Sequence, residues 1–205
     1  MQYITLKEKL RDFTVFPIIE IRKLDTGFHR RRLNEWQDKG YIKKVIKGYY
    51  IFSDLKLNEN ALFEIANRIY SPSYISLEMA LSYYGLIPES VYAITSVTSR
   101  RTYRFNASIA TFLYKTIKAS LFFGYELIQY NNKSFKIASL EKAILDYFYI
   151  NPHKKTDEDF ASLRINRDML FKQLDEGKLM AFLERFAKIA LAKRVKSFLE
   201  FMKSA

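Results

Sequence analysis

Residues 15–52 read VFPIIEIRKLDTGFHRRRLNEWQDKGYIKKVIKGYYIF, and they carry the clearest pattern of helices and strands in the chain. Its middle predicts a helix that begins near Thr26 or Gly27 and ends at Lys39, because threonine caps helix starts and Gly40 can take the left-handed turn that follows. At about 100° per residue, apolar and polar residues of this helix fall on opposite faces. The apolar face is Phe28, Leu33 and Trp36, and the polar face is Arg30, Arg31, Asn34 and Asp38.

The residues before this helix predict two more helices. Residues 4–12 have Leu6 and Leu10 four positions apart, which places both on one face. Pro17 suits the first turn of the next helix, where its missing N–H costs nothing. The inward stripe of that helix is expected to be Ile18, Ile21 and Leu24. The second and third helices, at this spacing, make a helix-turn-helix.

Residues 41–52 predict a hairpin after the three helices. They are rich in β-branched and aromatic side chains, and Lys47-Gly48 lies where a tight turn would reverse the chain. A helix-turn-helix followed by such a hairpin is a winged helix, which places its second helix in the major groove of DNA and its hairpin beside a phosphate strand. We therefore expect DNA contacts from Thr26, His29, Arg30, Arg31, Asn34, Lys43, Lys44 and Lys47.

These residue types have different uses on DNA. Arg30 and Arg31 are expected to reach base edges or phosphates, and Asn34 is expected to pair with adenine. The three lysines of the hairpin are expected to neutralise backbone charge. The alternative is a solvated basic face on a small three-helix domain. Charge, helix spacing and hairpin together favour the DNA-binding interpretation.

Length and composition bound the rest of the chain. A chain of 205 residues is long enough for two domains, and we expect a winged helix over 1–56 and an α+β domain over 57–205. The net charge of +12 favours a polyanionic partner, double-stranded DNA rather than a membrane. The chain has no cysteine, which excludes disulfide scaffolds and thiolate zinc sites. Without a targeting segment or an apolar run that spans a membrane, we expect a cytoplasmic protein.

The second domain is expected to hold strands and then helices. Alternating β-branched and aromatic residues predict an antiparallel sheet, with a hairpin turn at Asn131-Asn132. Ser139 is expected to cap a helix through Tyr149, and the chain from Thr156 onward is expected to be helical with Gly177 as its clearest break. The expected strands lie near 91–98, 102–105, 109–117, 122–130 and 134–138. The fold class is therefore α+β, an N-terminal winged helix-turn-helix followed by a mixed domain with an antiparallel sheet and C-terminal helices.

The sequence contains no motif for catalysis, metal binding or cofactor binding. His29 and His153 lie in different expected domains, and the six glycines form no nucleotide-binding or hydrolase signature. The acidic run at 157–159 falls at an expected helix start, where the helix dipole stabilises it. We therefore expect no enzymatic activity, no cofactor and no metal. Three arginines at a strand connection suit either a functional surface or a solvated turn, and they are Arg100, Arg101 and Arg104.

Three segments together resemble one protein family. They are GYIKKVIKGYYIF at 40–52, YISLEMALSYYGLIPESVYAITSVTSRRTYRF at 74–105 and KIASLEKAILDYFY at 136–149, and they are similar to the AbiEi antitoxins of type IV toxin–antitoxin systems. The resemblance implies an N-terminal domain that represses its own operon at inverted repeats and a C-terminal domain that counters a nucleotidyltransferase-like toxin. Matching positions are Arg30, Arg31, Lys43, Lys44 and Lys47 for DNA, and Ser76, Arg100, Arg101, Ser139, Glu141 and Lys142 for a recurrent motif of the second domain.

The expected function is a DNA-binding transcriptional repressor and antitoxin that autoregulates its operon, with the three arginines as an antitoxin surface. Two alternatives stay open. A nucleic-acid-processing enzyme would hold its substrate on the winged helix and bring Glu126, Glu141 and Asp146 together around a metal. A protein-interaction module would use the basic surface to bind an acidic partner.

Overall fold

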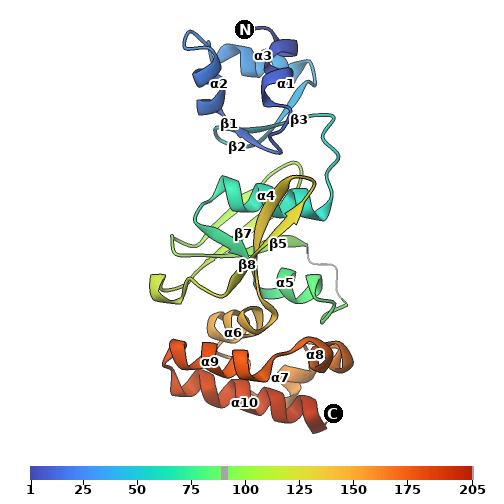
Figure 1. The fold of residues 1–205 in the computed structure, drawn as a ribbon, viewed down its shortest axis with the longest axis vertical. Helices are drawn as coiled ribbons and strands as arrows, with labels where there is room; N and C mark the ends of the chain where they lie inside the picture. The colour runs from blue at the N-terminus through green and yellow to red at the C-terminus, as the bar shows by residue number, and fades with distance from the viewer. Residues whose placement is uncertain (89–91, 205) are drawn as a thin grey trace.

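The computed structural model describes residues 1–88 and 92–204, and the α+β chain is arranged in three levels along its long axis (Figure 1). Residues 1–52 form helices and a small sheet at one end. A six-stranded sheet lies in the middle, and the helices that follow residue 140 lie at the other end. The N-terminus and the C-terminus are therefore at opposite ends of the molecule.

The N-terminal level packs three helices on an antiparallel sheet around its own apolar cluster. Leu6 and Leu10 are buried in that cluster, as the sequence predicts. Leu24, predicted to point inward, is 43% exposed, because it is the last residue of its helix and the chain turns away at Asp25. The elements are α1 (Tyr3–Leu10), β1 (Phe16–Pro17), α2 (Ile18–Leu24), α3 (Arg31–Asp38), β2 (Ile42–Ile46) and β3 (Tyr49–Phe52).

The start of α3 differs from its prediction at Thr26 or Gly27. Asp25 folds the chain into a turn instead, because its side chain accepts the Gly27 N–H at 3.1 Å and its carbonyl accepts the Phe28 N–H at 3.1 Å. Thr26 is exposed in that turn and is not a cap, and the helix begins four residues after Gly27, at Arg31. The end of the helix is as predicted, with Gly40 in the left-handed region at φ +69°.

The predicted hairpin is confirmed as β2 and β3, which pair antiparallel around Gly48 at φ +89°. The ladder shifts register between Lys44 and Ile46, so that Val45 is an extra residue on β2. The irregularity lets Val45 be buried while Lys43 and Lys44 before it stay exposed. β2 therefore contributes Val45 to the core and keeps Lys43 and Lys44 at the surface.

The middle level is a mixed sheet, so the prediction of an antiparallel sheet is wrong. The strand order is β6-β7-β5-β4-β9-β8, with parallel pairing of β5 with β7 and of β4 with β9. Alternation reveals strands but not their neighbours, and β4 is three residues long, too short for alternation to show. The strands are β4 (Ser73–Ile75), β5 (Ala93–Thr98), β6 (Tyr103–Asn106), β7 (Thr111–Thr116), β8 (Tyr125–Tyr130) and β9 (Lys133–Ala138).

Several local predictions in this level are confirmed. Asn131 and Asn132 have φ of +42° and +60°, and they form the turn that connects β8 to β9. Ser139 caps the next helix, its hydroxyl accepting the Lys142 N–H at 3.5 Å. The predicted strand start at Val91 lies outside the described residues. The helices are α4 (Glu59–Ile69), α5 (Leu77–Tyr83) and α6 (Leu140–Ile150), with a short 3₁₀ turn, η1 (Ala119–Leu121).

The C-terminal level is helical, and it breaks at Leu174 and Asp175, two residues before the predicted Gly177. Asp175 caps the helix there, accepting the Lys178 N–H at 2.9 Å, so Gly177 lies in a first turn whose N–H groups have no helical partners. A further break follows at Ala187, which takes the left-handed conformation at φ +48°. The helices are α7 (Asp157–Ala161), α8 (Arg167–Gln173), α9 (Glu176–Phe186) and α10 (Ile189–Ser204).

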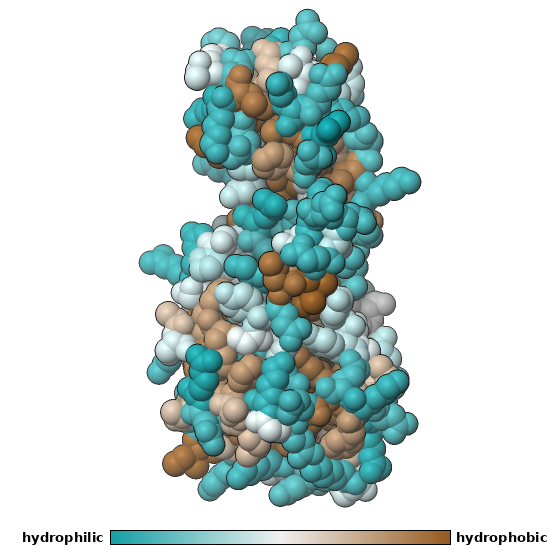
Figure 2. All heavy atoms as spheres, viewed as in Figure 1, coloured by the Kyte–Doolittle hydropathy of each residue, from teal (hydrophilic) through white to brown (hydrophobic). Residues whose placement is uncertain are grey.

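The N-terminal level and the sheet level share apolar contacts. Val15, Val45 and Ile51 are buried in the large cluster that fills the middle and C-terminal levels. Figure 2 shows hydrophilic side chains over most of one face, with apolar side chains gathered at the level of the six-stranded sheet. The small sheet therefore has one side on its own helices and another against the rest of the chain.

Candidate nucleic-acid interface

The polar face of α3 is exposed as its sequence predicts. Arg30, Arg31 and Asn34 are exposed, whereas Leu33 and Trp36 are buried. The Trp36 ring lies 6.0 Å from the Tyr3 ring and 5.6 Å from the Phe28 ring, between centroids. The helix is thus fixed by its apolar side, and its basic N-terminal end faces solvent.

A hollow of about 370 Å³ lies at this end of α3 and is lined in part by His29, Arg31 and Arg32. Arg32 is engaged within the fold, because its guanidinium donates to the Met1 carbonyl. Arg31 lies 3.7 Å from the Glu35 carboxylate and is 89% exposed, and an exposed pair of this kind holds a side chain only weakly. Arg31 is therefore able to turn toward a ligand, whereas Arg32 is a structural residue.

The hairpin brings its lysines to a second hollow. Lys43, Lys44 and Lys47 are exposed, and the last two line a groove of about 490 Å³ between β2 and β6. The opposite wall of this groove includes Arg104. Both β2 and β6 are edge strands of their sheets. The groove therefore gathers three cations from the two levels.

The predicted arginine cluster is divided by the structure. Arg104 faces the groove, and its Nε donates to Asn106 at 3.0 Å. Arg100 stacks on Tyr70, with 4.4 Å from the guanidinium carbon to the ring centre, and donates to the Ser71 carbonyl at 3.1 Å. Arg101 is exposed. Of the three, Arg104 lies with the hairpin lysines, and Arg100 is partly committed to holding its own turn.

A buried polar link joins the N-terminal level to the sheet level. The Thr14 hydroxyl donates to Glu64 Oε2 at 2.5 Å and accepts from Lys133 Nζ at 2.8 Å. The Tyr130 hydroxyl donates to the same carboxylate oxygen at 2.5 Å, and Arg68 Nε donates to Oε1 at 2.7 Å. Sequence reasoning missed this link, although a glutamate on the apolar side of α4 was a visible signal. It joins the segment before β1 to α4 and to the β8–β9 pair of the sheet level.

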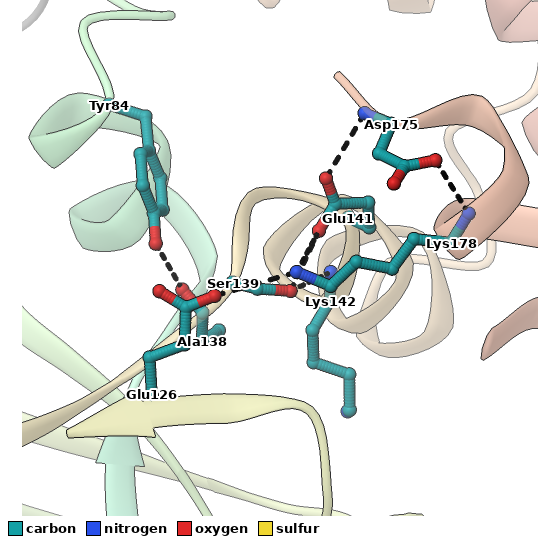
Figure 3. Close-up of polar contacts among 8 residues, drawn as sticks. All are labelled: Tyr84, Glu126, Ala138, Ser139, Glu141, Lys142, Asp175 and Lys178. Atoms are coloured by element: carbon teal, nitrogen blue, oxygen red, sulfur yellow. Dashed lines mark hydrogen bonds and ion pairs between the residues drawn. The ribbon is translucent and has the colours of Figure 1, made fainter. Parts of the chain in front are cut away.

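The recurrent motif around Ser139 lies away from this interface, where α6 meets α9 (Figure 3). Glu141 is buried and accepts from the Ser139 hydroxyl at 2.9 Å, the Asp175 N–H at 3.2 Å and Lys178 Nζ at 3.0 Å. Lys178 also lies 3.4 Å from Glu126. These contacts tie two helix starts together, which is a structural use of the motif.

Lys142 and Asp146, one turn apart on α6, form a fully buried ion pair. Asp146 Oδ2 also accepts from the Tyr74 and Ser76 hydroxyls, each at 2.9 Å. Burial lowers the pKa of the Lys142 ammonium, against the opposing effect of Asp146, and burial raises the pKa of the Asp146 carboxyl. Ser76 and Lys142, both motif residues, therefore meet in one core network that solvent does not reach.

The carboxylates of the enzyme alternative do not gather around a common point. Glu126 and Glu141 share Lys178, whereas Asp146 is paired with Lys142. Within the described part of the chain, no group of three histidine or acidic residues could hold a metal ion.

Comparison with known proteins identifies no family for this chain. No protein-family model matches the sequence, and no curated protein matches it. Across residues 1–88 and 92–204, no helix has the length and apolar character needed to cross a membrane. What the chain does must therefore be inferred from its own surface.

Proposed function

We propose that this chain is a DNA-binding transcriptional repressor whose residues 1–56 act as a winged helix-turn-helix. The observation that carries the proposal is the exposed basic end of α3, held from behind by Leu33 and Trp36, next in sequence to a hairpin with three exposed lysines. A recognition helix needs a rigid apolar back and a free polar front. Both are supplied by the one-sided pattern of this helix.

In this proposal the two elements have different tasks. Arg31 and Asn34 read base edges in the major groove, because arginine and asparagine match guanine and adenine edges with paired hydrogen bonds. Arg30 and His29 lie at the helix start and contact phosphate or base edges, with Thr26 in the turn before them. The hairpin lysines neutralise phosphates beside the groove. Specificity thus comes from α3 and most of the affinity from charge.

Arg104 belongs with the DNA contacts in this proposal. It lines one groove with Lys44 and Lys47, so a phosphate strand that follows the hairpin passes this arginine as well. The Thr14–Glu64 link holds the two walls of the groove on one body. The second domain therefore adds to the DNA footprint, which the sequence alone assigned to residues 1–56.

We further propose that the partner is an inverted-repeat operator upstream of the chain's own operon, in the cytoplasm, and that the chain is an antitoxin against a nucleotidyltransferase-like toxin. This part is supported by the resemblance of residues 5–150 to the AbiEi antitoxins. Arg100 and Arg101 are exposed motif residues that do not line the DNA groove, and Arg100 is held by Tyr70 and Ser71. If wild type rescues growth from the toxin and Arg101→Glu does not, the result would support an antitoxin surface at Arg101. Full rescue by Arg101→Glu would contradict such a surface.

Binding to the DNA upstream of the gene tests the proposed function directly. Fluorescence anisotropy with labelled duplex should show an affinity whose logarithm falls with log salt at a slope of about −0.9 for each phosphate contacted. An acidic polypeptide should compete only weakly. Binding that is independent of salt, or stronger binding to the acidic polypeptide than to DNA, would favour the protein-interaction alternative.

A further inference from the structure

A third hollow, of about 180 Å³, lies between α4 and the ends of β4 and β9, apart from the DNA groove. We propose that it binds a small ligand through a phosphate group. Six of its lining residues carry hydrogen-bond donors, and they are Asn67, Arg68, Ser71, Ser73, Ser134 and Lys136. The site does not depend on whether the chain binds DNA.

Two buried polar atoms on residues that line this cavity make no hydrogen bond within the described residues. They are the Ser73 hydroxyl, on a residue that is 2% exposed, and the Asn67 side-chain nitrogen. Buried polar groups in folded proteins nearly always have a partner, and one that lacks it is destabilising. Both residues line the same hollow, so one bound group can satisfy both.

The orientation of the Asn67 amide is set by the backbone. The Lys136 N–H donates to Asn67 Oδ1 at 2.5 Å, which leaves the NH₂ end as the unpartnered end. The amide therefore has an unpartnered donor on a residue that lines the cavity. Ser73, on β4, offers a hydroxyl from a different element of the fold. A ligand with acceptor atoms in several directions fits this arrangement.

The charge of the cavity favours an anion. Arg68 and Lys136 are the cations in its lining, and Glu64 is the carboxylate. Glu64 is already engaged at both oxygens, by Arg68 at Oε1 and by the hydroxyls of Thr14 and Tyr130 at Oε2. Only Nε of Arg68 is used in that pair. The Lys136 ammonium lies 5.3 Å from the centre of the Tyr125 ring and has no carboxylate partner among the described residues. Positive charge is therefore in excess on the cavity side.

Donors from three elements, together with two cations and one engaged carboxylate, favour an oxyanion. A tetrahedral phosphate presents acceptor oxygens toward all three elements at once, and a guanidinium binds it with paired donors. Water also fills polar cavities of this size. Saturable binding, measured at constant ionic strength, separates a phosphate site from a water-filled one.

The test uses the full chain, labelled with ¹⁵N, and titrates inorganic phosphate while the side-chain signals of Asn67 and Arg68 are followed by NMR. We expect both signals to move along one saturable curve in the low millimolar range or tighter. Acetate should bind more weakly, and dimethyl phosphate separates a free phosphate from a nucleic-acid backbone. Absence of saturation, equal binding of acetate, or binding of dimethyl phosphate alone would overturn the proposal.

Two variants and one control locate the binding. Ser73→Ala should weaken phosphate binding by about tenfold, the effect of removing one hydrogen bond, without lowering the melting temperature, because it removes an unpartnered buried hydroxyl. Arg68→Gln should weaken it at least as much. Lys118→Gln removes an exposed cation that does not line the cavity and should leave binding unchanged. Unchanged affinity in Ser73→Ala, or an equal loss in Lys118→Gln, would contradict the site.

Discussion

Thr14 and Glu64 are separated by 50 positions in sequence, and the Thr14 hydroxyl donates to the Glu64 carboxylate at 2.5 Å in a buried setting. This contact joins the N-terminal level to α4 of the sheet level. Around it lie the apolar contacts of Val15, Val45 and Ile51. The basic hairpin and Arg104 consequently face one groove with a fixed geometry, which a flexible linker between independent domains would not provide.

Replacing Thr14 by valine should show how much this link contributes. Valine keeps the branched shape but removes the hydroxyl, so Lys133 loses its acceptor and Glu64 loses a donor. We expect the free energy of unfolding to fall by about 1–3 kcal/mol, measured by urea denaturation. Thr5→Val, at an exposed position of α1, is the matched control and should stay within about 0.5 kcal/mol of wild type. Equal effects at the two positions would show that the link is not stabilising.

Removing residues 1–56 should leave a folded but weakened fragment. Residues 57–205 keep most of the large apolar cluster, but they lose Val15, Val45 and Ile51 from it. We expect the free energy of unfolding to be lower than that of the full chain by about 3 kcal/mol or more, since each buried aliphatic side chain contributes about 1.5–3 kcal/mol. Circular dichroism with urea measures this. A fragment as stable as the full chain would mean that the two levels do not share a core.

The Lys142–Asp146 pair should behave as a unit. Removing one partner leaves a buried charge, so Lys142→Met and Asp146→Leu should each lower the free energy of unfolding by about 3–5 kcal/mol. The double variant should lose much less than the sum, because no unpaired charge is left. A double-mutant cycle by urea denaturation measures the coupling. Additive losses would show that the two side chains do not depend on each other.

Charge reversal at two nearby arginines should show whether DNA binds in the groove or only to the general positive charge around it. Arg104→Glu should weaken binding to all duplexes and reduce the steepness of the log–log salt dependence by about 0.9 for each phosphate that the variant no longer neutralises. Arg101→Glu makes the same change of charge three residues away, outside the groove lining, and should have a much smaller effect. Identical losses of affinity in the two variants would point to general charge repulsion and not to binding in the groove.

Local features of this chain could be predicted from the sequence because their causes are local. The buried side of α3, the turn at Gly48 and the cap at Ser139 each depend on residues a few positions apart. The start of α3 could not be placed, because Asp25 competed with Thr26 for the preceding turn. The break predicted at Gly177 lies two residues earlier for a related reason, since Asp175 caps α9 and leaves Gly177 in its first turn.

Long-range features could not be predicted in the same way. The order of the six strands depends on which edges meet, and a period-two pattern carries no such information. Arg100 packs on Tyr70, whereas Arg104 lines a groove with the hairpin. Both neighbours are distant in sequence, so the sequence could not show that the two arginines have different surroundings. The buried ion pair had a visible signal, a lysine and an aspartate one turn apart in an otherwise apolar helix. The pair shows that Lys142, a residue of the recurrent motif, has a structural role in the core.

The most direct test of the central claim is the affinity of Arg31→Ala and Asn34→Ala for upstream DNA and for random duplex, at one salt concentration. If α3 reads bases, each variant should lose about 1–3 kcal/mol of discrimination between the two duplexes, roughly a fivefold to 150-fold change in their affinity ratio. Lys172→Ala, which removes an exposed cation from α8 near the opposite end of the molecule, should leave the ratio unchanged. A wild-type chain without preference for upstream DNA, or variants whose affinity ratio equals that of wild type, would contradict the account.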